Sequence, residues 1–498
     1  MHVLVGVARL AQRKVSGLDH AIALHRAGQL AEAEAAYLSW LRSHPGDPDA
    51  NFYLGGLRQQ QGLPGEAVAL FQQVLAQDPE RVDAWVNLGV AQRSRGELSI
   101  ASACLERAIA LEPGSAVAHY NLGVVLQDRR MSAEALRELD AAIALRPGHA
   151  GSHCNRGTVL AALNRDIEAL ESFDGALTLE PEHALARHNK GLALLRLGRF
   201  RDAWPQCEYR WKRPGAAAYR HGATPPWNGT DTLRGKRILF WSEQGFGDTL
   251  QFCRFANVLA DRGAAVLLEV QKPLRTLLGE LEGVAQCFAQ GEPLPACDFQ
   301  MPLLSAPMAL QTDAGSIPAR VPYLLPPPAR VESVRPYLGD PDGLPRVGIV
   351  CSGSRTHVND ANRSIPLARF AALFGRARLF LLQTDVHAAD TEALAASPIR
   401  DLRPILRDFR DTAAVISHLD LVISVDTAVA HLAGAMGKPV WILLPFAPDW
   451  RWMQERDDSP WYPTARLFRQ RQPGDWSHVL ARLVAQFDER SHLTQDSP

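Results

Sequence analysis

The chain has 498 residues, which is more than one compact core usually holds, so two or three domains are expected. Apolar residues make up 46% and charged residues 21% of the chain, a composition typical of globular proteins. The chain has 53 basic and 54 acidic residues, so its net charge is −1 and gives no support to nucleic-acid binding.

The cysteines and the apolar runs constrain the location of the protein. Seven cysteines are scattered without a Cys-x-x-Cys pair, which favours a reducing, cytoplasmic compartment and argues against a structural zinc site. No apolar run reaches the roughly 18 residues of a membrane span, and the longest, around Val440 to Phe446, is expected to be a buried strand. Residues 1–16 form an extension without a basic region before its apolar patch, so no signal peptide is expected.

The first two hundred residues repeat with a step of 34 residues. The step recurs in prolines (Pro45, Pro79, Pro113, Pro147, Pro181), glycines (Gly55, Gly89, Gly123, Gly157, Gly191), alanines (Ala33, Ala67, Ala101, Ala135, Ala169, Ala203) and bulky residues (Tyr37, Phe71, Leu105, Leu139, Phe173). Each unit predicts a helical hairpin, with the glycine in its first helix, the alanine in its second and the proline after it. The glycine and the alanine are expected where the paired helices approach closely.

This pattern resembles the tetratricopeptide repeat, through Asn-Leu-Gly at Asn87 to Gly89 and Ala-x-x-x-Phe at Ala67 to Phe71. The resemblance covers residues 17–211 and implies an α-helical solenoid of about six repeats with a partner-binding concave face. Four asparagines recur on the first helices: Asn87, Asn121, Asn155 and Asn189. They either bind the backbone of a protein or peptide acceptor, or are simply common at this repeat position.

The remaining chain predicts a linker and two α/β lobes. Residues 212–234 are rich in Pro and Gly and form the linker, and residues 235–335 and 345–485 alternate short β-rich runs with helical stretches. The expected strands are Ile238 to Trp241, Ala265 to Val270, Val347 to Cys351, Leu379 to Leu382, Leu421 to Ser424 and Val440 to Leu444. Two parallel sheets imply a cleft between the lobes, and residues 486–498 form a polar tail.

The first lobe opens with a strand followed by a glycine-rich turn. Gly245 and Gly247 follow the strand, where a ligand can lie against bare backbone, and Asp248 stands at the start of the next helix. Asp248 is either a general base or a helix cap that accepts amide hydrogen bonds from Leu250 or Gln251. The Gly-x-Gly-x-x-Gly spacing fails at Leu250, so NAD binding is not expected.

The second lobe carries two polar clusters. Ser352 and Gly353 follow its first strand, and Arg363 is either a bidentate phosphate ligand or a surface arginine. Asp426 and Thr427 begin a helix after a later strand, with His431 one turn further on, and a helix start is itself an anion site that suits a diphosphate. The alternative for His431 is a purely structural role.

Several motifs in matching order add a resemblance to glycosyltransferase family 9, the heptosyltransferase-like enzymes, over residues 234–485. The family motifs are GDTL at Gly247 to Leu250 and VDTAVAHLAGA at Val425 to Ala435. The chain is more particularly similar to bacterial proteins that join tetratricopeptide repeats to such a module, through SEQGFGDTLQF at Ser242 to Phe252, RSIP at Arg363 to Pro366, DWRW at Asp449 to Trp452 and DSPWYP at Asp458 to Pro463. The resemblance implies a GT-B fold, two Rossmann-like lobes with a cleft. It further implies an inverting transfer of a sugar from a nucleotide-sugar donor to a hydroxyl or amide, without metal or other cofactor.

The resemblance also implies roles for individual residues. Asp248 would be the base, Arg363 would neutralise the donor diphosphate where the family usually has lysine, and Asp426 would bind the sugar. Thr427 and Ala428 would give backbone amides to the diphosphate, with His431 behind the phosphates. The donor loop departs from the family, because Cys351 replaces an aromatic residue and Gly353 to Arg355 replaces a different turn.

In plan, repeats followed by a GT-B module, the chain is similar to eukaryotic O-linked N-acetylglucosamine transferase. This plan predicts that the repeats present a protein or peptide acceptor to the cleft for glycosylation, and a homodimer is compatible with it. Two other readings remain: a scaffold whose GT-B module binds a nucleotide or glycan without turnover, and a GT-B sugar epimerase.

Overall fold

The computed structural model of the chain describes residues 17–357 and 359–495, so the extension expected at residues 1–16 lies outside the described residues. Contacts divide the chain into two compact units, one up to Ala186 and one from Arg187 onward. This division falls inside a helix of the expected solenoid. Within the described ranges, no helix has the combination of length and hydropathy that a membrane span requires.

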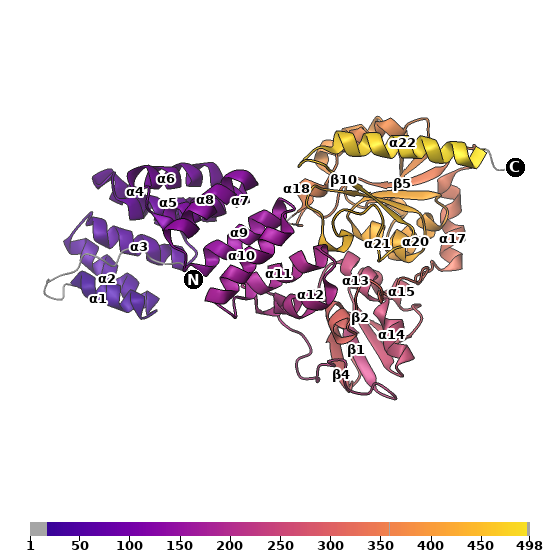
Figure 1. The fold of residues 1–498 in the computed structure, drawn as a ribbon, viewed down its shortest axis with the longest axis horizontal. Helices are drawn as coiled ribbons and strands as arrows, with labels where there is room; N and C mark the ends of the chain where they lie inside the picture. Colours follow the sequence, from indigo (N-terminus) through magenta and orange to yellow (C-terminus); the bar gives the residue numbers. More distant parts are fainter. Residues whose placement is uncertain (1–16, 358, 496–498) are drawn as a thin grey trace. The chain divides into compact units, whose positions relative to one another are not determined.

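The first unit consists of antiparallel helix pairs (Figure 1). Its helices are α1 (Gly17–Arg26), α2 (Leu30–Ser43), α3 (Pro48–Gln60), α4 (Pro64–Gln77), α5 (Val82–Ser94), α6 (Leu98–Leu111), α7 (Ala116–Asp128), α8 (Ser132–Leu145), α9 (Ala150–Ala162) and α10 (Asp166–Leu179). α11 (Ala184–Arg196) crosses into the second unit and is followed by α12 (Phe200–Cys207). The predicted α-helical solenoid is confirmed.

The close approach of paired helices explains the glycine ladder. A β-carbon added to Gly55 would lie 2.7 Å from the Phe71 ring, and one added to Gly157 would lie 2.6 Å from the Phe173 ring. In the last pair, a β-carbon on Gly191 would lie 2.8 Å from a sulfur atom, Sγ of Cys207. In the five hairpins that carry the glycine, a side chain of the second helix therefore fills the space that the glycine leaves in the first helix. The first hairpin has Ala21 at this position.

The segment after the repeats packs against the first lobe. A 3₁₀ helix, η1 (Glu208–Lys212), follows α12, and the next residues run without regular structure to β1. Trp227 is buried and its backbone N–H donates to the carbonyl of Gln300 at 2.9 Å, while the N–H of Gln300 donates to the carbonyl of Pro225 at 2.9 Å. Part of the segment expected as a linker therefore pairs with β4 at the edge of the sheet.

The first lobe is a parallel sheet of order β3-β2-β1-β4 (Figure 1). Its strands are β1 (Arg237–Trp241), β2 (Ala265–Val270), β3 (Val284–Ala289) and β4 (Phe299–Pro302). Its helices are α13 (Phe246–Phe252), α14 (Phe255–Asp261), α15 (Arg275–Leu278) and α16 (Ala306–Ala309), with 3₁₀ helices η2 (Lys272–Leu274) and η3 (Leu303–Ser305). The sequence predicted β1 and β2; β3 and β4 are additional strands.

The second lobe is a larger parallel sheet of order β10-β9-β8-β5-β6-β7. Its strands are β5 (Arg346–Val350), β6 (Arg378–Leu381), β7 (Arg400–Asp401), β8 (Leu421–Val425), β9 (Val440–Leu444) and β10 (Ala465–Arg469). The helices are α17 (Pro328–Val334), α18 (Asp360–Arg363), α19 (Thr391–Ala395), α20 (Phe409–Ser417), α21 (Ala428–Ala435) and α22 (Trp476–Gln495), with η4 (Arg335–Leu338), η5 (Leu367–Leu373), η6 (Ala388–Asp390), η7 (Arg403–Ile405) and η8 (Trp450–Trp452).

All four strands predicted in the second lobe are present, and the two-lobed α/β architecture is confirmed. Figure 1 shows α22 in yellow along one face of the sheet, where Val479 and Leu483 join the buried core with Ile349 and Ile423. The helix continues to Gln495, so most of the segment expected as a polar tail is helical.

Candidate active site

Two motifs recognised separately in the sequence meet where the lobes touch. α13 of the first lobe packs against α21 of the second lobe. A β-carbon on Gly247 would lie 2.8 Å from Cδ2 of His431 and 3.7 Å from Cα of Ala428. The glycine is therefore needed for the close contact, and it brings the turn before Asp248 to the first residue of α21.

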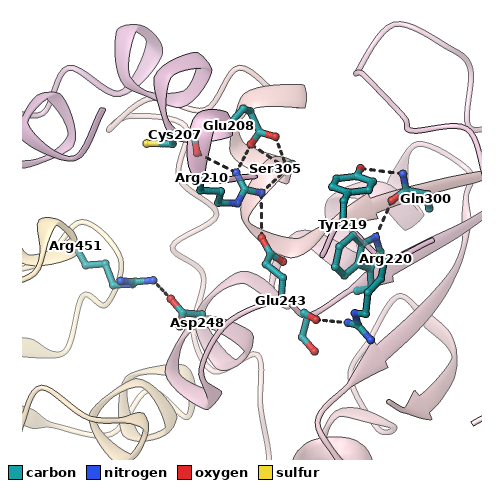
Figure 2. Close-up of polar contacts among 12 residues, drawn as sticks. Cys207, Glu208, Arg210, Tyr219, Arg220, Glu243, Asp248, Gln300, Ser305 and Arg451 are labelled. Carbon is teal, nitrogen blue, oxygen red and sulfur yellow. Dashed lines mark hydrogen bonds and ion pairs between the residues drawn. The ribbon is translucent and has the colours of Figure 1, made fainter. Parts of the chain in front are cut away.

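Asp248 is engaged through both carboxylate oxygens. It is the third residue of α13, and Oδ2 accepts the backbone N–H of Gly245 at 2.9 Å. The carboxylate caps its helix by reaching back to Gly245 rather than by accepting from Leu250 or Gln251. Oδ1 forms an ion pair with Arg451 of the second lobe (Figure 2). Asp248 thus lies at the lobe boundary, where a carboxylate can serve a substrate held between the lobes.

Arg451, which sequence reasoning missed, holds this carboxylate in place. Its guanidinium is buried, pairs with Asp449 at 2.8 Å and lies 4.6 Å from the centroid of the Trp450 ring. It also donates to the side chain of Gln251. One arginine therefore pairs with Asp248 and Asp449 together.

Arg363 lies beside the start of α21. Its Nη1 donates to the carbonyl of Asp426 at 2.7 Å, and its Nε lies 3.5 Å from Oδ1 of Asp360. A β-carbon on Gly353 would lie 2.2 Å from Nη2 of Arg363, so the glycine makes room for the guanidinium. Only 11% of the Arg363 side chain is exposed, which does not fit a surface arginine. The two clusters predicted in the second lobe are therefore in contact.

Ser352 makes internal contacts. Its backbone N–H donates to Oε1 of Gln383 at 3.3 Å, and its hydroxyl accepts from Nε2 of Gln383 at 3.0 Å. The side chain is buried. Ser352 therefore fixes the loop that carries Gly353, and the structure shows no open hydroxyl there.

The start of α21 offers backbone amides. Thr427 is the residue before the helix, yet its side chain makes no capping hydrogen bond; its hydroxyl lies 3.0 Å from the hydroxyl of Ser424. The first amides of α21, beginning at Ala428, point out of the helix end, where the helix dipole adds partial positive charge. With Arg363 on the carbonyl of Asp426, this end of α21 suits an anion.

His431 is a buried neutral side chain. Its Nδ1 lies 2.9 Å from the hydroxyl of Tyr462, and its ring stacks on Trp452 with centroids 5.4 Å apart. Burial, with added repulsion from Arg451 and Arg254, holds the pKa of His431 well below its usual range. These contacts favour the structural role over direct phosphate binding.

Asp426 also carries a shifted pKa. Burial raises the pKa of this carboxyl, and the nearby charge of Asp449 raises it further. Its Oδ1 lies 3.8 Å from Nε2 of His431. A carboxyl with a raised pKa is suited to hydrogen bonding with an uncharged ligand such as a sugar hydroxyl.

A second carboxylate, Glu243, was missed by sequence reasoning. It lies just after β1, only 4% of its side chain is exposed, and Oε1 accepts from Nη2 of Arg210 at 3.0 Å (Figure 2). Burial raises the pKa of Glu243 to about 7; Arg210 opposes this rise, and the nearby charge of Asp248 adds to it. The sequence did contain a signal for this residue: Glu243 is acidic and follows the carboxyl end of a parallel strand, where ligands of such sheets bind.

The repeat asparagines are not equivalent. Asn87 and Asn121 line a cavity of about 270 Å³ in the first unit. Nδ2 of Asn121 donates to the carbonyl of Val117 at 2.8 Å in its own helix, and Nδ2 of Asn155 donates to the Tyr120 hydroxyl at 3.2 Å. Nδ2 of Asn87 is buried without a hydrogen-bond partner among the described residues. Asn189 lies on α11 in the second unit.

No group of three or more His, Cys, Asp or Glu side chains in the described part of the chain has a metal-binding arrangement. All seven cysteines are free thiols.

Helical hairpins followed by two parallel α/β lobes define a helical solenoid joined to an α/β module, and this arrangement is consistent with an α/β glycosyltransferase fold. Family models agree. Tetratricopeptide repeat models match residues 58–120 and residues 18–63, 91–150 and 154–218, and the model of glycosyltransferase family 9 (heptosyltransferase) matches residues 382–444. The chain is therefore similar to tetratricopeptide repeats over its helical hairpins and to glycosyltransferase family 9 over part of its second lobe. That match includes Asp426, Thr427 and His431 but not Asp248 or Arg363.

A curated relative is Protein FlbA of Caulobacter vibrioides, 26% identical over 284 residues. The match covers 52% of this chain and 47% of FlbA, so the chain spans about half the length of this relative. Among solved structures, MamA is 25% identical with a TM-score of 0.31, over 35% of this chain and 99% of MamA. A tetratricopeptide repeat protein of Thermus thermophilus, TTC0263, is 23% identical with a TM-score of 0.32, over 36% of this chain and 97% of that protein.

Proposed function

We propose that the chain is an inverting, metal-independent glycosyltransferase that moves a sugar from a nucleotide-diphosphate sugar to an acceptor hydroxyl or amide. The family 9 match supports glycosyl transfer. The observation that carries the proposal is the meeting of Asp248 from one lobe with the start of α21 and Arg363 from the other.

The donor diphosphate binds at the start of α21 in this proposal. The amides of Thr427 and Ala428 and the guanidinium of Arg363 face the two phosphates, while Asp426 hydrogen-bonds the sugar. As the bond between the anomeric carbon and the diphosphate oxygen breaks, the leaving group takes the electron pair. A helix dipole and a fixed cation can stabilise that charge, so the step requires no metal.

Asp248 is the proton acceptor. The acceptor oxygen or nitrogen forms a bond to the anomeric carbon on the face opposite the diphosphate, which inverts the configuration, and its proton passes to the carboxylate. Arg451 shifts its guanidinium toward Asp449 as Asp248 is protonated, and the Gly245 N–H keeps the carboxylate oriented. His431, locked by Tyr462 and Trp452, supports the wall behind the phosphates.

The acceptor is a protein or peptide that the repeats bind. The unpartnered amide of Asn87 in the first unit's cavity supports this part of the proposal, because a carboxamide can pair with a peptide backbone. Asn87→Ala should raise the KM for the acceptor protein, whereas Asn121→Ala, which removes an amide already bonded to its own helix, should change it less. Equal KM values for both variants and the wild type would exclude the repeat asparagines from acceptor binding.

The proposal is tested with a panel of UDP, GDP, ADP and dTDP sugars. The wild type should be stabilised against heat by one donor class and should release the nucleoside diphosphate from it. The Asp248→Ala variant should still be stabilised against heat by the donor but should no longer release nucleoside diphosphate from it. Equal release by the two proteins would show that Asp248 is not the base.

A second candidate is a scaffold that binds a nucleotide sugar without turnover. The full engagement of Asp248 by Gly245 and Arg451 favours it, because both carboxylate oxygens already accept from donors of the protein. Donor stabilisation without diphosphate release, in the presence of the natural acceptor, would select this candidate.

A further inference from the structure

A cavity of about 370 Å³ lies within the second unit, next to the proposed catalytic carboxylate. Part of the lining comes from α11, α12 and η1, the last helical hairpin with its 3₁₀ extension. The rest includes Glu243 and Gln244 of the first lobe and Asp449 to Arg451 of the second. Arg451 faces the cavity and pairs with Asp248, so the cavity adjoins the base through this arginine.

The lining carries an unusual concentration of unsatisfied polar atoms. Five of them are buried without a hydrogen-bond partner among the described residues: Nδ1 of His188, Nε of Arg210, Nε1 of Trp211, Nε of Arg213 and Oε2 of Glu243. The side chains of Arg210 and Glu243 are 5% and 4% exposed. Each such group costs about 1–3 kcal/mol when it is left unpaired, so the cavity is built to receive polar groups.

Two arginines that line the cavity, Arg210 and Arg451, are already paired with carboxylates. Arg210 pairs with Glu243 at 3.0 Å and also with Glu208, and Ser305 joins the same network (Figure 2). Arg451 is balanced by the carboxylates described above. An anionic acceptor group would have to compete with these carboxylates for the two arginines, and a cationic group would lose its hydration in a buried site, so the cavity suits an uncharged group.

His188 adds no charge to this lining. Burial, with added repulsion from Arg213 and Arg210, lowers the pKa of His188 to about 4, so its imidazole is neutral at physiological pH. The unsatisfied N–H groups of the lining require oxygen acceptors, and the free oxygen of Glu243 requires a hydroxyl or amide donor. A peptide residue with a hydroxyl or carboxamide side chain supplies both: its carbonyl oxygens accept, and its side chain donates.

We propose that this cavity is the acceptor subsite for a serine, threonine or asparagine of a polypeptide, and that Oε2 of Glu243 accepts the hydrogen bond from the reacting side chain. The inference rests on the proposed function and adds to it the place and the chemistry of the acceptor. A polypeptide, rather than a free sugar, is favoured because a repeat hairpin forms part of the lining, and stacked hairpins present surfaces for extended chains. Glu243 is then an acceptor-binding residue beside Asp248.

The test uses the full chain and capped tripeptides, Gly-Ser-Gly, Gly-Thr-Gly and Gly-Asn-Gly, with Gly-Ala-Gly and a methyl glycoside as comparison ligands. Binding is measured by calorimetry without donor, and sugar transfer is measured with saturating donor. At least one of the three polar tripeptides should bind and accept sugar, and Gly-Ala-Gly should not. Transfer to the methyl glycoside alone, or no binding of any tripeptide, would overturn the inference.

Glu243→Gln should raise the KM or Kd for the tripeptide at least tenfold. Because Arg210 donates to the inner oxygen, the glutamine carbonyl must face Arg210, which turns its NH₂ group to the cavity where an acceptor stood. Glu208→Gln is the matched control, since Glu208 pairs with the same arginine but does not line the cavity. Equal effects of both variants would assign Glu243 a purely structural role.

The two proposals fail in distinguishable ways. If the wild type binds the tripeptides but releases no diphosphate from any donor, the proposed transfer is wrong and the cavity assignment stands. If donor release is normal and Glu243→Gln binds and modifies the tripeptide like the wild type, the cavity assignment is wrong and the transfer stands.

Discussion

Gly247 and His431 lie in van der Waals contact across the two lobes: a β-carbon on the glycine would be 2.8 Å from Cδ2 of the imidazole. The histidine cannot move aside easily, because the Tyr462 hydroxyl and the Trp452 ring hold it from other sides. This contact sets how closely Asp248 on α13 approaches the start of α21. The glycine in the Gly-Asp motif thus has a packing role between the lobes.

Gly247→Ala should therefore push the lobes apart. We expect a loss of roughly 1–3 kcal/mol in the free energy of unfolding, typical of overpacking, and at least a tenfold loss of diphosphate release, because Asp248 would be displaced from the donor. Urea unfolding and donor turnover would measure both. Gly222→Ala is the control, since its β-carbon would meet nothing closer than 3.9 Å and should leave both quantities unchanged. A wild-type turnover in Gly247→Ala would contradict this account of the contact.

The repeat glycines give a second prediction. Gly157→Ala should destabilise the first unit by roughly 1–2 kcal/mol, because a β-carbon 2.6 Å from the Phe173 ring outweighs the better helix propensity of alanine. Gly65→Ala, in α4 with open space around it, should leave stability unchanged or raise it slightly. Denaturant unfolding followed by circular dichroism compares the two variants. Phe173→Leu should partly restore the stability of Gly157→Ala, and failure to do so would place the strain elsewhere.

The contrast between Gly157 and Asp248 explains what could be predicted from the sequence. The partner of Gly157 lies in the next helix at a fixed spacing, so a periodic pattern reveals the contact. The partner of Asp248 is Arg451, 203 residues further along the chain, and no local pattern encodes that pairing. The strands β1, β2, β5, β6, β8 and β9 were predictable for the same reason as the hairpins, because their apolar runs are local, whereas β3, β4, β7 and β10 were not predicted.

Burial was the other feature that the sequence concealed. Glu243 becomes an unusual carboxylate only because Arg210 and the last hairpin cover it, and His431 is a buried neutral side chain because Trp452 and Tyr462 enclose it. The residue types were visible, but the surroundings that decide their chemistry come from distant segments. The similarity in plan to O-linked N-acetylglucosamine transferase stays a prediction.

Arg363 gives a prediction about the donor. Arg363→Ala should weaken donor binding by roughly 10- to 100-fold, since a charged contact to a phosphate contributes about 1.5–3 kcal/mol. Arg363→Lys should retain part of the affinity, because the charge remains while the bidentate geometry is lost. Gly353→Ala should resemble Arg363→Ala in donor binding but not in stability, because the added β-carbon would displace the guanidinium at its flexible end. Calorimetric titration with the preferred donor measures all three, and unchanged affinity in Arg363→Ala would remove this residue from the donor site.

Glu243 gives a prediction about pH. Its pKa is raised from 4.5 to about 7 in the folded protein, mainly by burial. Between these values the folded state binds more protons than the unfolded state, so the free energy of unfolding falls as pH rises. The contribution of Glu243 is fully present below pH 4.5 and is lost as pH rises through about 7, a change of roughly 3 kcal/mol.

Glu243→Gln does not titrate and should lack this dependence. The difference in unfolding free energy, wild type minus variant, should therefore decrease as pH rises from 4 to 8, as measured by urea unfolding at each pH. The lowered pKa of His188 has the opposite effect, because it makes the free energy of unfolding rise with pH. His188 is present in both proteins, so its contribution cancels in the difference. Parallel pH curves for the two proteins would mean that Glu243 titrates normally and that Arg210 offsets its burial.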